Sequence, residues 1–150
     1  MKSSTTIFSW CVSLLLSSAL SLKAQSLLPS PSGEAARYDA YIELPRGYLS
    51  GVCIMRCAGD TLRGSIFNEF GVSAMDFVYD RRKDRVRLLS VMKMMDRWYI
   101  RRTLRSDLRL LLRSMNAGEG EYRNERRHIL YRFTPMADSL DTPHPHDTEE

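Results

Sequence analysis

The chain has 150 residues, of which 43% are hydrophobic, and its 22 basic residues outnumber 18 acidic ones. This length and apolar content suit a single folded domain and exclude a disordered chain. The net charge of +4 invites comparison with nucleic-acid-binding proteins. However, loss of an N-terminal signal would leave 20 basic and 18 acidic residues and remove the chain from cytoplasmic nucleic acid, so we expect no nucleic-acid partner.

Residues 1–24 have the layout of a secretory signal peptide. Lys2 supplies the positive charge, residues 7–22 form an apolar stretch, and Ala24 precedes a suitable cleavage point. The stretch contains five serines and is shorter than the roughly 20 predominantly apolar residues of a membrane-spanning helix. We therefore expect an exported protein of the periplasm or cell envelope, or one released from the cell.

Composition divides the remainder into three parts. Residues 25–37 are rich in serine and proline and are predicted to be a linker. Residues 38–135 are predicted to form one β-rich domain. Residues 136–150 carry five carboxylates and few apolar groups, which predicts a disordered acidic tail because little surface can be buried.

Short alternating apolar runs separated by turn residues are typical of antiparallel strands. The predicted strands cover residues 38–44, 48–57, 61–70, 72–79, 85–92 and 126–133. Three consecutive connections of two to five residues favour a meander. The expected fold class is therefore α+β, with a curved antiparallel sheet of about five to seven strands and one amphipathic covering helix.

The apolar period changes to a helical one after Asp96, which we expect to be the N-cap. A helix of about 20 residues then ends at Asn116-Ala117-Gly118. Its apolar stripe contains Ile100, Leu104, Leu108, Leu111 and Met115.

Residues that carry enzyme chemistry are not arranged in any known motif. No histidine accompanies a predictable nucleophile, and His144 and His146 lie in the acidic tail. Asp76 is read either as a buried carboxylate or as a polar position on the open sheet face. We therefore expect a non-catalytic protein that needs neither a cofactor nor a metal.

Cys53 and Cys57 would be the only thiols after export. Residues four apart on one strand are separated by about 13 Å, which is beyond disulfide reach. We interpret both as small buried hydrophobic side chains, and their pairing between chains stays open.

Two surfaces are candidate binding sites. A methionine-rich and aromatic set between sheet and helix would suit acyl chains, although an ordinary core has the same composition. Its predicted ligand-binding members are Met55, Met75, Phe77, Tyr79, Ile100 and Leu104. Space between these side chains would favour a lipid, and contact would favour a packed domain.

The second surface is the basic face of the helix, which suits either an anionic membrane surface or simple solvation. Residues 81–113 carry 12 basic and 3 acidic groups. The predicted basic face consists of Trp98, Arg102, Arg105, Arg109 and Arg113.

The signal peptide, the strands from GYLSGVCIMRCAGDTLRG onward and the helix DRWYIRRTLRSDLRLLL together resemble the bacterial envelope lipoprotein carriers of the LolA and LolB-like class. The resemblance covers residues 38–133 by pattern, and those proteins are longer, so no binding residue transfers individually. It implies an antiparallel half-barrel covered by helices that holds lipid or lipoprotein acyl chains. The alternative is a small interaction or scaffold domain whose basic helix face binds an acidic protein partner. The oligomeric state is left open.

Overall fold

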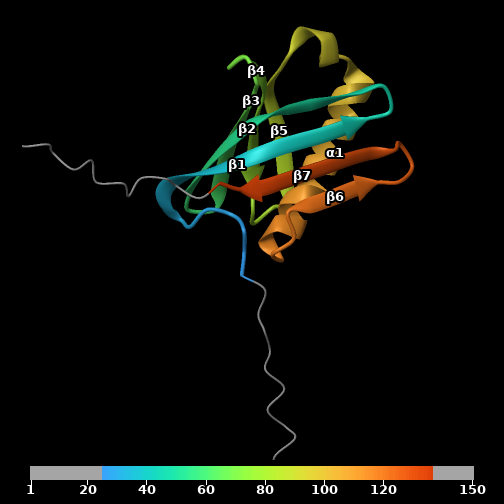
Figure 1. The fold of residues 1–150 in the computed structure, drawn as a ribbon. Helices are drawn as coiled ribbons and strands as arrows, with labels where there is room; N and C mark the ends of the chain where they lie inside the picture. The colour runs from blue at the N-terminus through green and yellow to red at the C-terminus, as the bar shows by residue number, and fades with distance from the viewer. Residues whose placement is uncertain (1–24, 137–150) are drawn as a thin grey trace, which may run out of the picture.

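A computed structural model describes residues 25–136, so the predicted signal peptide and nearly all of the acidic tail lie outside the described residues. One antiparallel sheet has the strand order β5-β4-β3-β2-β1-β7-β6 (Figure 1). Its strands are β1 (Ser32–Leu44), β2 (Gly47–Ala58), β3 (Thr61–Asn68), β4 (Ser73–Asp80), β5 (Arg85–Val91), β6 (Glu121–Asn124) and β7 (Ile129–Pro135). The predicted α+β class and the meander from β1 to β5 are confirmed.

The sheet curls into a half-barrel around the helix α1 (Trp98–Asn116), which follows the short 3-10 helix η1 (Lys93–Met95) (Figure 1). Helix α1 contacts β5 and β6, which are the two edge strands. It therefore covers the gap between the edges, and after it the chain returns antiparallel to β1 through β7. One helix is thus enough to cover the inner face of the sheet.

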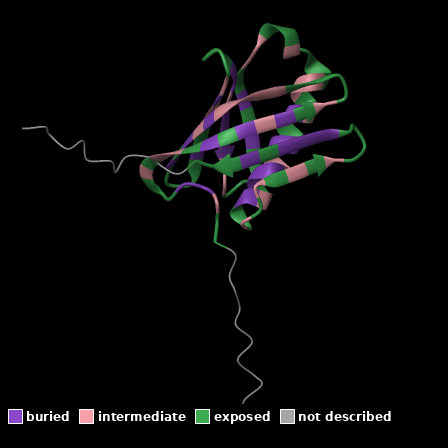
Figure 2. Ribbon diagram, in the orientation of Figure 1, coloured by how far each residue is buried: buried purple, intermediate pink, exposed green. Residues whose placement is uncertain are grey.

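Alternation along the strands gives the sheet its inner face. Tyr38, Ala40 and Ile42 of β1 are buried, whereas the residues between them are more exposed (Figure 2). In β2 the buried residues are Cys53, Met55 and Cys57. No disulfide joins the two cysteines within the chain, as their spacing predicts.

The helix supplies the other half of the core. Its buried apolar residues are Leu104, Leu108, Leu111, Leu112 and Met115. They form one continuous cluster with the inner face of the sheet. Beneath it, a Cβ atom on Gly64 would collide with the ring of Phe77, so only glycine fits there.

Three sequence expectations need correction. The predicted linker over residues 25–37 is strand from Ser32 onward, and Leu28 before it is buried against the core. Strand β6 was missed because four residues give too little alternation to be recognised. Asp96 is not the N-cap of α1: that position is Arg97, which has an extended backbone and makes no side-chain capping bond, and the carboxylate of Asp96 accepts a bond from Arg101.

Candidate functional site

The space between the sheet and the middle of α1 is occupied by side chains. Of the predicted ligand-binding residues, Met55, Met75 and Phe77 are at most 1% exposed. Tyr79 and Leu104 are also buried, and all five belong to the same cluster. Their hydrophobic surfaces therefore contact neighbouring core residues, which is the arrangement expected of a packed domain. A ligand-binding role for this set stays a prediction.

An apolar pocket lies at the end of the half-barrel where α1 begins. It has a volume of about 380 Å³. Its walls come from the β1–β2 turn, η1, the first two turns of α1 and the start of β7. The lining residues are Leu44, Pro45, Met95, Tyr99, Ile100, Thr103, Leu104, Arg127 and Ile129. Only Ile100 and Leu104 of the predicted ligand set contribute to it.

Exposed apolar side chains gather around the same end. In the antiparallel order, the β1–β2, β3–β4, β5–α1 and β6–β7 connections all lie at this end of the strands. Of the eight large hydrophobic residues that are exposed within residues 25–136, six lie in these connections or within two residues of them, Leu89 lies near the end of β5, and Met136 lies at the opposite end of the sheet. We call this region the apolar end; its exposed residues are Tyr48, Phe70, Val72, Leu89, Met94, Trp98 and Tyr99.

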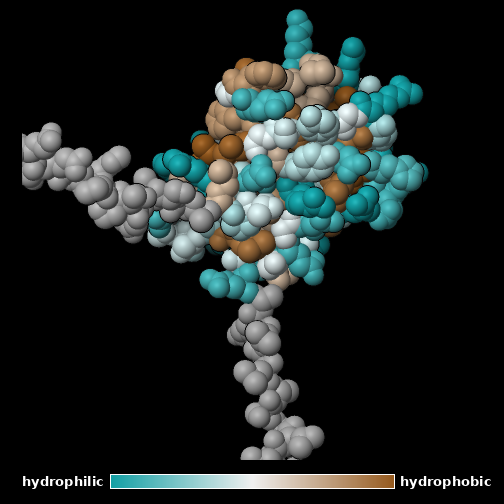
Figure 3. All heavy atoms as spheres, viewed as in Figure 1, coloured by the Kyte–Doolittle hydropathy of each residue, from teal (hydrophilic) through white to brown (hydrophobic). Residues whose placement is uncertain are grey.

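Several of these hydrophobic side chains are largely exposed to solvent. Phe70 is 81% exposed, and Met94 and Trp98 are both 76% exposed. Figure 3 shows hydrophobic surface at the top of the molecule, where the β3–β4 connection and η1 lie. Single exposed apolar residues are ordinary, but a group at one end of a domain indicates an interaction surface.

Positive charge accompanies the apolar end. The four connections carry five basic residues, which are Arg46, Lys93, Arg97, Arg126 and Arg127. They carry three acidic residues, and two of these are already paired: Asp96 with Arg101, and Glu125 with Arg123. Helix α1 also begins here with no acidic residue in its first turn and no side-chain cap, so the positive end of its dipole adds to the field.

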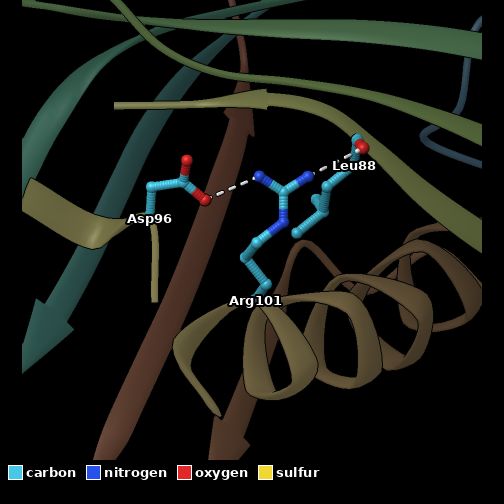
Figure 4. A network of polar contacts seen from close by, with 3 residues as sticks. All are labelled: Leu88, Asp96 and Arg101. Carbon is cyan, nitrogen blue, oxygen red and sulfur yellow. Dashed lines mark hydrogen bonds and ion pairs between the residues drawn. The ribbon is translucent and has the colours of Figure 1, made fainter. Parts of the chain in front are cut away.

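Arg101 links two segments at the apolar end (Figure 4). One guanidinium nitrogen lies 2.8 Å from a carboxylate oxygen of Asp96, and another donates to the backbone oxygen of Leu88 at 3.3 Å. The side chain thus ties the η1–α1 connection to the edge strand β5. The two contacts of Arg101 therefore hold residues 94–99, several of which are exposed, beside β5.

The predicted basic face divides in two. Trp98 belongs to the apolar end, whereas three of the arginines line a cleft of about 250 Å³ between α1 and the start of β5. The lining residues are Asp84, Arg85, Val86, Arg102, Arg105, Ser106 and Arg109. Arg113 instead forms an ion pair with Asp84 at 3.6 Å. Arg85 was not predicted, because only the packing of α1 beside β5 brings it to this row.

A buried polar cluster also escaped prediction. Asp107 is 2% exposed within the helix stripe and accepts bonds from Asn124 at 2.9 and 3.0 Å and from the Tyr131 hydroxyl at 3.0 Å. Burial, together with the Asp107 charge, raises the pKa of Tyr131, which keeps the hydroxyl as a donor. The available signal was an aspartate between Leu104 and Leu108 on the apolar stripe.

The fold and surface define a half-barrel α+β domain with a packed interior, an apolar end and a separate basic cleft. A scan of protein-family models found no match for the chain, and searches of curated proteins and of solved structures found no similar protein. No helix in residues 25–136 is long and apolar enough to cross a membrane. Those residues also hold no group of three or more metal-ligating side chains.

Proposed function

We propose that the protein is an exported, non-catalytic envelope protein that docks its apolar end on an anionic membrane surface. The observation that carries this proposal is that seven exposed hydrophobic residues lie toward one end of the sheet, six of them in its connections or within two residues of them. Tryptophan and tyrosine suit the boundary between water and lipid, because the ring is apolar and the N–H or O–H group stays hydrated.

The basic residues of the apolar end would favour an anionic membrane surface over a neutral one. Each lysine or arginine close to an anionic bilayer contributes about 1 kcal/mol of attraction. The basic residues of the apolar end lie on the same connections as its hydrophobic residues, so insertion and attraction would act together. The exposed start of α1 adds backbone N–H groups that attract phosphate oxygens.

The apolar pocket extends the proposal to a lipid tail. It opens among the same connections and is lined mainly by apolar side chains. We propose that it accepts the end of one acyl chain from a docked lipid or lipoprotein. This differs from the lipoprotein carriers that the sequence resembles, in which acyl chains lie between sheet and helices, because here that space is filled by core residues.

Vesicle sedimentation tests the proposal. The purified protein should sediment with phosphatidylglycerol vesicles at low salt and less at high salt, because screening weakens the attraction. It should sediment little with neutral phosphatidylcholine vesicles. Replacing Phe70 and Trp98 together by alanine should weaken phosphatidylglycerol binding at least about tenfold, since two buried rings would each contribute more than 1 kcal/mol.

Met136→Ala is the matched control, because Met136 is an exposed hydrophobic residue at the opposite end of the sheet. It should leave vesicle binding unchanged. Equal losses in the control and in the Phe70/Trp98 variant would contradict docking by the apolar end. Absence of vesicle binding, with binding to an acidic protein instead, would favour the interaction domain.

A further inference from the structure

The cleft between α1 and β5 concentrates positive charge away from the apolar end. Arg102, Arg105 and Arg109 line it from the helix and Arg85 lines it from the first position of β5. Among the described residues, none of these four arginines forms an ion pair with a carboxylate: the five ion pairs of residues 25–136 involve other basic residues. Within residues 25–136, the cleft therefore holds four guanidinium groups that form no ion pair with a carboxylate.

The one carboxylate in the cleft is engaged with other groups. Asp84 accepts a hydrogen bond from the Tyr79 hydroxyl at 3.0 Å and pairs with Arg113 at 3.6 Å. Burial and the bond to Asp84 raise the pKa of Tyr79 to about 12, so this donor persists over the physiological range. Asp84 thus neutralises Arg113 and leaves the other arginines in excess.

Arg109 contributes a buried donor to the cleft. Among the described residues its Nε atom is buried without a hydrogen-bond partner, as is the Nε atom of Arg81, which does not line the cleft. A buried donor without a partner is costly, whereas a charged acceptor placed beside it would form a strong, short bond. The remaining guanidinium groups and the Ser106 hydroxyl line the same cleft, so an anion there would meet donors from both walls.

We infer that this cleft binds a phosphomonoester group, either on a soluble phosphorylated molecule or on a lipid headgroup. Arginine matches phosphate oxygens with its planar fork of donors. A phosphomonoester carries about −1.5 to −2 charges and three acceptor oxygens at neutral pH, so it balances several arginines better than a single carboxylate does.

The site is distinct from the membrane-docking end. At about 1.5 Å per residue along a helix, Arg109 lies about 16 Å from Trp98 along α1. Loss of one site should therefore leave the other intact, and the two proposals can fail separately.

Titration with inorganic phosphate, followed by calorimetry or amide chemical shifts, tests the soluble source. Saturable binding should weaken about tenfold or more in Arg105→Gln and in Arg109→Gln, because each removes a charge-assisted bond. Vesicles test the lipid source: the protein should prefer phosphatidic acid over phosphatidylglycerol at equal surface charge, and the same variants should lose that preference.

Arg87→Gln is the matched control, since it removes one charge from the same strand but does not line the cleft. Circular dichroism and thermal unfolding verify folding, and the exposed Arg105 keeps the test valid if Arg109→Gln is unstable. If Arg105→Gln and Arg109→Gln lose phosphate binding, the ligand is a soluble phosphomonoester. If they lose only the preference for phosphatidic acid vesicles, the ligand is a lipid headgroup. Equal losses with Arg87→Gln, or no phosphate response in either assay, would overturn the site.

Discussion

Methionine and aromatic side chains fill the space beneath the middle of α1, whereas the same residue types stand in solvent at the apolar end. Met75 and Phe77 are fully packed, but Met94 and Trp98 are 76% exposed. The difference comes from what lies over them. Leu108 and Leu111 of α1 are buried in one cluster with the inner face of the sheet, whereas η1 contains no buried residue and Trp98 begins α1 outside that cluster. Composition alone therefore does not distinguish a core from a binding surface.

The largest expected effect follows from truncating the core. Phe77→Ala should reduce the free energy of unfolding by about 3–5 kcal/mol, because it removes a buried ring and leaves a cavity under α1. Trp98→Ala should change it by less than about 0.5 kcal/mol, as for other exposed sites. Denaturant unfolding measures both values. Similar losses for the two variants would mean that the regions are not packed as differently as described.

A smaller effect is expected at the buried polar cluster. Tyr131→Phe removes the hydroxyl that donates to Asp107 and should cost about 1–2 kcal/mol of unfolding free energy, since Asn124 still donates to the carboxylate. Tyr122→Phe is the control, because the Tyr122 ring lies beside Tyr131 but its hydroxyl makes no hydrogen bond among the described residues. An equal loss of unfolding free energy in both variants would contradict a stabilising hydrogen bond from Tyr131 to Asp107.

The smallest effect concerns Asp76 on the outer face of the sheet. Burial raises its pKa, but hydrogen bonds from Ser90, Ser65 and Ser73 outweigh burial and lower it. A carboxyl whose folded pKa is lowered contributes stability above its unfolded pKa of about 4 and loses it as pH falls. Asp76→Asn should thus lower stability at pH 7 and reduce its acid dependence.

Unfolding midpoints measured from pH 7 down to about pH 2 test this sign. Asp39→Asn, which replaces an exposed aspartate of β1 without a side-chain hydrogen bond in the described structure, is the control for removal of one carboxylate. A steeper acid dependence in Asp76→Asn would contradict the account of the serine contacts.

Much of the fold follows from local sequence patterns. Alternation located five strands of the meander to within one or two residues at most ends, and the apolar stripe located α1. The start of β1 was misplaced because serine, proline and glycine near Ser32 read as a linker, although β2 pairs with that segment. The start of β1 therefore depends on pairing with β2, which the local composition of residues 25–37 does not reveal.

The site was harder to predict, for the same reason. The arginines of α1 were predicted as a row, but Arg85 joins them only because β5 packs against the helix. Phe70 and Tyr48 are far from Trp98 in sequence, and only the strand order brings their connections to one end. A helical period shows which residues share a face, but not what lies opposite that face.

Trp98 provides the most direct test of docking, because it is the only tryptophan in the described residues and stands at the apolar end. Its fluorescence should be typical of a solvated indole in buffer. Phosphatidylglycerol vesicles should shift the emission to shorter wavelength and protect it from an aqueous quencher, as the ring enters the lipid interface. An unshifted, fully quenchable emission from vesicle-bound protein would contradict docking through the apolar end.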